Sequence, residues 1–285
     1  MLSWQVGAVK VTRIQEMQVP IPGGPDGGFI AEATAPALRA IPWLYPNFVN
    51  EQDQMLLSIH ALLVEAPGLR LVVDTCVGND KPRGLTGGNP LATKFLEAFE
   101  DAGWTRDSVD AVICTHMHVD HVGWNTMLVD GKFVPTFPNA RYLLGRVEFE
   151  HWSAEGDAEQ QAILADSVQP ILDAGLAEFV GLDYVVSPEV RLVPTTGHTP
   201  GHVSVMITSG GETAIITGDM SHHPCQMAHP DWSPSFDSDK QAAAVTRARM
   251  FAEWADAEHL VIGTHYAEPT AGHIRRDGDA FRFET

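Results

Sequence analysis

The sequence predicts an α/β protein in which mixed β-sheets are covered by helices. β-rich runs occur both as hairpins and in alternation with helical segments, a combination typical of mixed sheets with helices packed on them. Several of these runs end directly in loops that carry His and Asp. The 285 residues are 44% hydrophobic and 19% charged, which indicates a globular chain with enough apolar surface for a core.

The expected elements follow from two spacing patterns. Runs of apolar and β-branched residues between turn residues predict strands, and apolar residues at helical spacing predict helices. The predicted strands and hairpins cover residues 4–20, 59–75 (a hairpin that turns at Pro67 and Gly68), 109–114, 141–145, 190–195, 202–208, 213–219 and 259–266. The predicted helices cover residues 90–103, ended by Gly103, then 157–175, and 239–257, capped by Asp237 or Ser238.

No shift in composition marks a domain boundary, so we expect one domain over residues 1–285. Residues 1–58 are interpreted as an N-terminal extension or arm of that domain. The apolar segment at residues 43–48 has two interpretations: a loop packed on the core, or a lid or dimer arm that lines a substrate pocket. The second interpretation predicts a homodimer.

The acidic balance of the chain disfavours several classes of partner. Asp and Glu number 37 against 18 Lys and Arg, which gives a net charge of −19, and such a charge repels nucleic acids and anionic lipid surfaces. No apolar run approaches the roughly 20 residues that span a bilayer. The 3 cysteines cannot form a complete set of disulfides, and the first residues do not resemble a signal peptide. We therefore expect a cytoplasmic protein without a nucleic-acid or membrane partner.

The segment from Thr115 to His121 contains the strongest functional signal. His116, His118, Asp120 and His121 follow directly after a short apolar strand. In extended chain, His116 and His118 point to the same side, and a turn after them lets Asp120 and His121 face a second centre. Imidazole and carboxylate ligands suit zinc, iron, manganese, cobalt or nickel, and zinc is the commonest choice for hydrolysis.

Three further candidate ligands lie where predicted strands give way to loops, which is the usual edge for sites in layered α/β folds. His198 follows the strand at 190–195, Asp219 ends the strand at 213–219, and His265 follows the apolar part of the strand at 259–266. Each of these residues alone has an ordinary interpretation as a loop or turn residue. Together with the first segment they complete a set of ligands for two metal ions.

The pattern His116-X-His118-X-Asp120-His121, followed in order by His198, Asp219 and His265, resembles the metallo-β-lactamase superfamily of hydrolases. The resemblance runs from about residue 60 to 266. It implies an αβ/βα four-layer sandwich of two mixed β-sheets flanked by helices, with a site at one edge. It also implies two divalent metal ions, most commonly zinc, and a small-molecule substrate.

The resemblance assigns roles to individual residues. It gives His116, His118 and His198 to one metal ion, Asp120, His121 and His265 to the other, and Asp219 to both. Asp74, at the end of an early strand, resembles the family's buttress for the metal loop, and the alternative is a turn residue at a strand end. His202 resembles a frequent position behind the ligands, and the alternative is a packing role.

Two such ions, about 3.5–4 Å apart, can hold a bridging hydroxide that attacks a carbonyl or phosphoryl group. Asp120 would then act as a catalytic residue that orients the hydroxide and passes its proton to the leaving group. The stretch at residues 222–224 resembles the place where a tyrosine contacts the carbonyl oxygen in lactonases of this superfamily. His222 would take the place of that tyrosine and is the second catalytic candidate. Its alternative is a loop histidine near the metals.

Several branches of the superfamily fit poorly. Asp219 argues against β-lactamases, the 20 residues after His265 are too few for a glyoxalase II, and the acidic charge disfavours nucleases. The remaining branch resembles lactonases and methyl-parathion-hydrolase-like enzymes, so we expect a hydrolase that opens a lactone or ester, with N-acyl homoserine lactones as candidates. An organophosphate triesterase, a β-lactamase-type hydrolase, a mononuclear iron oxygenase and a metal-binding protein without turnover stay open as alternatives. The expected apolar pocket is lined by aromatic residues of two loops, namely Trp43, Tyr45, Phe48, Trp232 and Phe236.

Overall fold

The structure is a computed structural model that describes residues 1–285, and the chain divides into two compact units. Unit 1 comprises residues 1–16 and 59–184, and unit 2 comprises residues 17–58 and 185–285. Two of the three divisions between the units fall within the strands β2 (Val9–Ile21) and β3 (Met55–Ala66), and the third falls between Tyr184 and Val185. The single domain over residues 1–285 stays a prediction.

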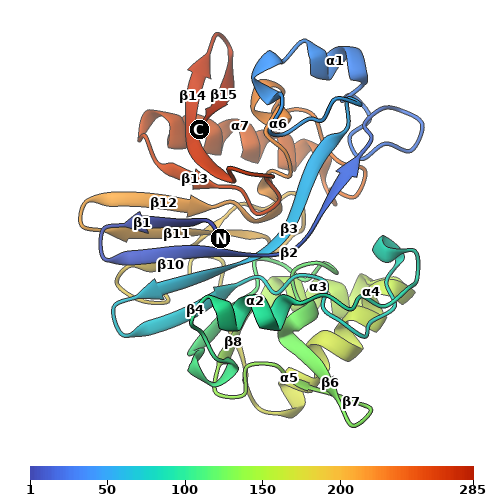
Figure 1. Ribbon diagram of the computed structural model, residues 1–285, viewed down its shortest axis with the longest axis vertical. Helices are drawn as coiled ribbons and strands as arrows, with labels where there is room; N and C mark the ends of the chain where they lie inside the picture. Colours follow the sequence, from blue (N-terminus) through green and yellow to red (C-terminus); the bar gives the residue numbers. More distant parts are fainter. The chain divides into compact units, whose positions relative to one another are not determined.

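The sheet of unit 1 has seven strands in the order β1-β2-β3-β4-β5-β8-β9. Figure 1 labels β1 to β4 and β8 of this sheet. Besides β2 and β3, these strands are β1 (Ser3–Val6), β4 (Leu69–Val73), β5 (Ala111–Ile113), β8 (Arg141–Gly145) and β9 (Ala177–Val180). The β1–β2 and β3–β4 pairs are antiparallel, whereas β4, β5, β8 and β9 run parallel. The sheet is therefore mixed, as predicted, and the predicted hairpin at residues 59–75 is confirmed as β3–β4.

The prediction of one strand over residues 4–20 is wrong. The chain turns between β1 and β2 at Gly7, whose φ of 54° is a left-handed value that glycine adopts without steric cost, and the two strands pair antiparallel. The predicted helix at 90–103 also begins later, as α2 (Phe95–Asp101). The side chain of Asn79 accepts the N–H of Thr93 and donates to its carbonyl, which holds that backbone outside the helix.

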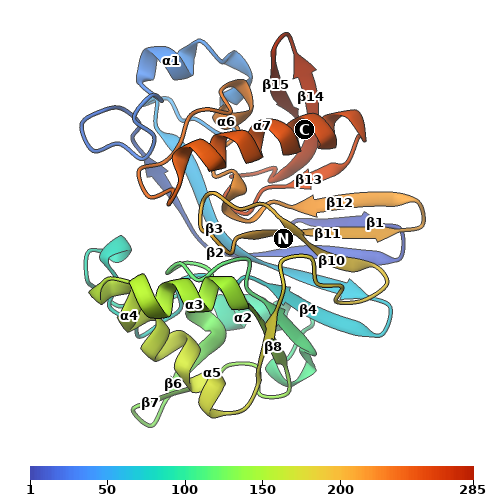
Figure 2. The ribbon, with the colours of Figure 1, turned by 180° about the vertical axis from the view of Figure 1, so that it is seen from behind.

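The remaining elements of unit 1 lie after β5. The predicted helix at 157–175 is confirmed as α4 (Ala158–Ile163), a π-helical turn (Leu164–Val168) and α5 (Gln169–Asp173). The sequence did not predict α3 (Arg146–Glu155) or the hairpin of β6 (Thr126–Val129) and β7 (Lys132–Pro135). Helix α3 packs on β8, the strand that it follows (Figure 2).

The sheet of unit 2 has six strands in sequence order. They are β10 (Val190–Pro194), β11 (Val203–Ser209), β12 (Glu212–Ile216), β13 (Leu260–Ile262), β14 (Ala271–Asp277) and β15 (Ala280–Glu284). Only β12 and β13 pair parallel. The β14–β15 hairpin was not predicted. Its turn contains Gly278 with a φ of 62°.

Three α-helices belong to unit 2: α1 (Ala35–Arg39), α6 (Cys225–Ala228) and α7 (Lys240–Asp256). Helix α7 packs against β14 (Figure 2). Its N-cap is Asp239, whose carboxylate accepts the N–H of Ala242 at 2.9 Å, so the predicted cap at Asp237 or Ser238 is wrong. The Asp237 carboxylate contacts His198 and Arg247 instead. No helix of the protein has both the length and the apolar character that crossing a membrane requires.

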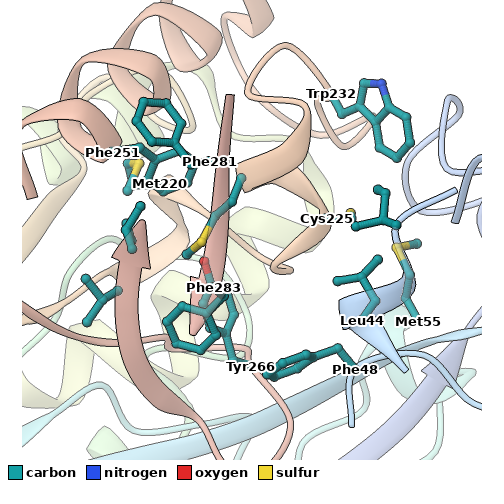
Figure 3. Packing of buried hydrophobic residues seen from close by; sticks show 14 of the residues in the cluster. Leu44, Phe48, Met55, Met220, Cys225, Trp232, Phe251, Tyr266, Phe281 and Phe283 are labelled. Atoms are coloured by element: carbon teal, nitrogen blue, oxygen red, sulfur yellow. The ribbon is translucent and has the colours of Figure 1, made fainter. Parts of the chain in front are cut away.

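The core of unit 2 includes part of the N-terminal segment. Phe48 is 2% exposed, and its ring lies edge-on to those of Tyr266 and Phe283, with centroids 6.4 and 5.9 Å away (Figure 3). Leu44 belongs to the same buried cluster. Burial of these side chains favours the interpretation of residues 43–48 as a loop packed on the core.

A buried lysine in unit 1 has an unusual environment. Lys81 is 0% exposed, its Nζ donates to the carbonyl of Thr126 at 2.9 Å, and it lies 4.3 Å from the ring centroid of Phe133. Burial disfavours the ammonium form and lowers the pKa of Lys81 from 10.5 to about 8.

This pKa predicts how stability depends on pH. Between pH 8 and 10.5 the unfolded chain binds more protons at Lys81 than the folded chain, so the free energy of unfolding rises with pH. The contribution of this group is about 3 kcal/mol over that interval. Urea unfolding measures the free energy of unfolding of the wild type and of Lys81→Met. The difference between the two proteins should change by this amount between pH 8 and 10.5. Parallel pH profiles of the two proteins would contradict the lowered pKa.

Candidate metal centre

Asp74 organises the His-rich loop of unit 1. Strands β4 and β5 run parallel, so Asp74 after β4 and Thr115 after β5 emerge at the same edge of the sheet. Asp74 Oδ1 accepts the N–H of Thr115 at 2.8 Å, and Oδ2 accepts its hydroxyl at 2.9 Å. Oδ2 also lies 2.9 Å from Nδ1 of His121. With Nδ1 held in this way, Nε2 is the nitrogen through which His121 can bind a metal.

The donors of this loop form two pairs, and the atoms within each pair have the spacing of ligands that share an ion. Nε2 of His116 lies 3.1 Å from Nδ1 of His118, and Nε2 of His121 lies 3.4 Å from Oδ1 of Asp120. Tetrahedral zinc with bonds of about 2.0–2.1 Å separates its donor atoms by about 3.3 Å. Both pairs are close to this separation, and His116 has its Nδ1 held 3.1 Å from the Thr115 hydroxyl.

Helices α3 and α4 hold the middle of the loop. The N–H of Met117 donates to Oε1 of Glu148 at 3.1 Å, and Nε2 of Gln160 donates to the Met117 carbonyl at 2.7 Å. The indole N–H of Trp152 also donates to Glu148, and the Trp152 ring centroid lies 5.2 Å from that of His118. Glu148, Trp152 and Gln160 were not predicted from the sequence, because such a residue on a helix carries no signal of a contact with a distant loop.

Asp219 is the centre of a second cluster, in unit 2. Strands β12 and β13 are parallel, so Asp219 and His265, which follow them, share one edge of the sheet. Asp219 Oδ1 lies 3.0 Å from Nε2 of His265, whereas Oδ2 lies 3.5 Å from Nε2 of His198. The two oxygens of one carboxylate thus face two different imidazoles. This is the arrangement that a carboxylate shared by two metal ions requires.

The second ring nitrogens of these imidazoles are also held. His198 Nδ1 lies 2.8 Å from Oδ1 of Asp237, and His265 Nδ1 lies 3.0 Å from the carbonyl oxygen of Ser58. Such contacts fix the tautomer and the ring orientation of a metal-binding histidine. Sequence analysis considered Asp237 only as a helix cap and did not consider Ser58.

His202 holds the backbone of Asp219. Its Nε2 accepts the N–H of Asp219 at 2.7 Å, and its Nδ1 lies 3.0 Å from the carbonyl oxygen of Thr195. A ring that accepts through Nε2 and donates through Nδ1 is neutral. Gly218 comes close to this ring: a Cβ there would lie 2.5 Å from Nε2 of His202.

His222 lies beside the same carboxylate. Its side chain is 1% exposed, and Nε2 is 3.1 Å from Oδ2 of Asp219, yet neither ring nitrogen makes a hydrogen bond. The ring centroids of Phe29 and Phe236 lie 5.6 and 5.3 Å away. An unsatisfied buried imidazole is costly in a dry site, so this ring is suited to a ligand that supplies the missing partner.

The predicted pocket aromatics lie in different surroundings. Phe236 is 43% exposed and contacts His222 and Phe29. Phe29 was not predicted from the sequence, because it follows a Gly-rich turn without helical or strand spacing. Trp232 is 8% exposed and stacks on His229. The other three belong to the N-terminal segment: Phe48 is buried in the core, Trp43 packs against it, and Tyr45 donates its hydroxyl to Asp53.

The chain belongs to the metallo-beta-lactamase superfamily, since the profile of this superfamily matches residues 55–266. The family resemblance expected from the sequence is thereby confirmed, together with its fold of mixed β-sheets flanked by helices.

Several individual relatives are named N-acyl homoserine lactonases. An N-acyl homoserine lactonase of Bacillus sp is 26% identical over 157 residues, which cover 55% of this chain and 56% of the relative. The N-acyl homoserine lactonase AiiA of Bacillus thuringiensis subsp. kurstaki is 27% identical over 130 residues, or 45% of each chain. The chain thus spans about half the length of the curated relatives that it matches.

Solved structures share the fold. The hydrolase AbOPH of the beta lactamase superfamily superposes with a TM-score of 0.80 at 22% identity, covering 99% of this chain and 95% of that one. AidC, described as a dizinc quorum-quenching lactonase in complex with N-hexnoyl-L-homoserine, has a TM-score of 0.79 at 22% identity, with coverage of 99% and 96%.

The contact between Gly218 and His202 can be tested with a matched pair of glycines. Gly218 and Gly278 have φ values of 55° and 62°, but a Cβ at Gly278 would have no atom within 4 Å. Backbone strain alone should cost Gly278→Ala about 1–2 kcal/mol. Gly218→Ala should lose a further 1–3 kcal/mol or so, because it displaces His202 from the Asp219 amide. Urea unfolding measures both, and equal losses would contradict the role of His202.

Proposed function

We propose that this protein is a binuclear metal-dependent hydrolase that opens a lactone or ester, with N-acyl homoserine lactones as the first substrates to test. The observation that carries the proposal is the Asp219 carboxylate, whose Oδ1 faces His265 and whose Oδ2 faces His198. Membership of the metallo-beta-lactamase superfamily and the names of the lactonase relatives support it.

The proposed ligands are the seven His and Asp side chains expected from the sequence. His116, His118 and His198 would bind one ion, Asp120, His121 and His265 the other, and Asp219 both. The donor spacing within each unit and the held second nitrogens support this assignment. We propose zinc as the metal, because the set combines imidazole and carboxylate and the structurally similar AidC is described as dizinc. Iron, manganese and cobalt are accepted by the same ligand types.

Bound divalent ions lower the pKa of water and polarise a carbonyl group, and lactone hydrolysis needs both effects. Asp120 is half-buried and can take the proton of the attacking water on its carboxylate and deliver it to the leaving alkoxide. An N–H of His222 can donate to the carbonyl oxygen as negative charge develops there. Water adds across the ring ester bond, and the product is the hydroxy acid.

Phe29 and Phe236 extend this proposal to the substrate side chain. Their ring centroids lie 5.1 Å apart, and both rings contact the imidazole of His222. An apolar acyl chain or an aromatic leaving group would gain burial against them. Phosphotriesters and β-lactams are alternative substrates, because the same activated water can attack them. A single redox iron in the protein would instead indicate an oxygenase. A homodimer and a cytoplasmic location stay predictions.

Metal content and hydrolysis together test the function. Purified protein should contain two zinc ions per chain and open N-acyl homoserine lactones, and chelation should abolish turnover until zinc is restored. Asp219→Ala should lower kcat/KM at least about 100-fold because it removes the shared ligand. The exposed Asp279→Ala is the control and should leave the rate unchanged. Two bound ions with turnover only of paraoxon or nitrocefin would reject the lactone proposal, and iron without hydrolysis would reject the hydrolase.

The role of His222 can be separated from metal binding. His222→Leu should retain both ions and lower kcat by about 100-fold, the usual effect of losing one donor to a developing oxyanion. The half-buried His273→Leu is a matched control in the same unit. If His222→Leu loses one ion, His222 is a metal ligand, and its proposed contact with the substrate carbonyl is wrong.

A further inference from the structure

We propose that Arg247 is a positioning residue that joins the metal ligand His198 to the loop of residues 229–237 through Asp237. The inference rests on the proposed function, since it takes His198 as a metal ligand. Arg247 lies on α7, and sequence analysis gave it no role.

The Arg247 guanidinium is bound at several points of this loop. The side chain is 0% exposed. Nε donates to the carbonyl of Pro230 at 2.8 Å, Nη2 donates to the hydroxyl of Ser233, and Nη1 lies 3.2 Å from Oδ2 of Asp237. Nη1 also donates to the carbonyl of Met220 at 3.5 Å, one residue beyond Asp219. One rigid planar group therefore ties the start, the middle and the end of the loop to the turn that carries Asp219.

Asp237 transmits this anchoring to His198. Its side chain is 0% exposed, with Oδ2 facing Arg247 and Oδ1 lying 2.8 Å from Nδ1 of His198. The N–H of Ser238 donates to the carbonyl of His198 at 2.9 Å, and the N–H of Asp239 to that of Gly197 at 3.0 Å. The carboxylate thus holds Nδ1 of His198 while Nε2 points toward Asp219, 3.5 Å from Oδ2.

Burial of the Arg247–Asp237 ion pair indicates a role other than core packing. Removing a guanidinium and a carboxylate from water costs several kcal/mol each, and a well-packed apolar pair of similar size is often as stable. The same loop carries Phe236, whose ring centroid lies 5.8 Å from that of His198. The Arg247–Asp237 pair holds both His198 and the loop, so metal binding at His198 should order residues 229–237. Loss of the pair should weaken metal binding and loop order together.

The experiment compares Arg247→Met, Arg247→Lys and Asp237→Asn with Arg249→Met, whose arginine is exposed on the same helix. Metal titration measures the affinity for each ion, and hydrogen exchange of residues 229–237 is followed with and without zinc. In the wild type and in Arg249→Met, zinc should slow exchange in this loop. In the other three variants one ion should bind about 10–100-fold more weakly, the second ion should be retained, and the zinc-dependent protection should be lost.

Arg247→Lys keeps the charge but lacks the planar fork, so it tests the geometry of the anchor even if Arg247→Met does not fold. Unchanged affinities and protection in Arg247→Lys and Asp237→Asn would overturn the inference and leave the ion pair a structural role. If the wild type binds no metal, the proposed function fails. The Nδ1 proton resonance of His198 still tests the positioning role in metal-free protein. Its chemical shift should change in Arg247→Lys and Asp237→Asn and stay the same in Arg249→Met. An unchanged shift in the first two variants would overturn the inference.

Discussion

A hydrogen bond at one ring nitrogen of a buried imidazole orients the other ring nitrogen toward a metal, and the candidate centre depends on this constraint at three of its histidines. His121 is held by Asp74, His198 by Asp237 and His265 by the carbonyl of Ser58. Each partner differs in chemistry, yet each leaves Nε2 on the side of a neighbouring carboxylate. The donors are therefore oriented by the protein itself.

Two of the parallel strand pairs explain where the acidic groups lie. Asp74 and Thr115 leave neighbouring strands β4 and β5 at the same edge, and Asp219 and His265 do so after β12 and β13. Parallel pairing brings residues far apart in sequence to one edge with their polar groups beyond the last ladder hydrogen bonds. The same topology thus serves both units, with a carboxylate as the organising group in each.

The candidate metal-ligand atoms support the proposal of a hydrolase. The surroundings of His222 support the proposed substrate class. His222 is buried without hydrogen bonds among Phe29 and Phe236. A ligand with a polar carbonyl and an apolar substituent would satisfy both the imidazole and the aromatic rings. Lactones with an acyl chain, which we propose as substrates, have this combination. Arg247 anchors the loop that carries Phe236, so the proposed substrate contact and the proposed geometry of His198 as a metal ligand would share one support.

The sequence by itself determined the mixed α/β class, the β3–β4 hairpin and the order of the seven candidate ligands, because these features depend on local periodicity and on spacing within short motifs. It did not determine the later start of α2, the cap of α7 or the β14–β15 hairpin, which depend on competition between nearby polar groups and turns. Only the tertiary structure showed that Asp237 contacts His198 rather than capping a helix, and that Glu148 and Arg247 hold distant loops. These contacts join residues 17 to 39 positions apart. Packing decides a side chain's partner at that range, and it leaves no periodic pattern in the chain.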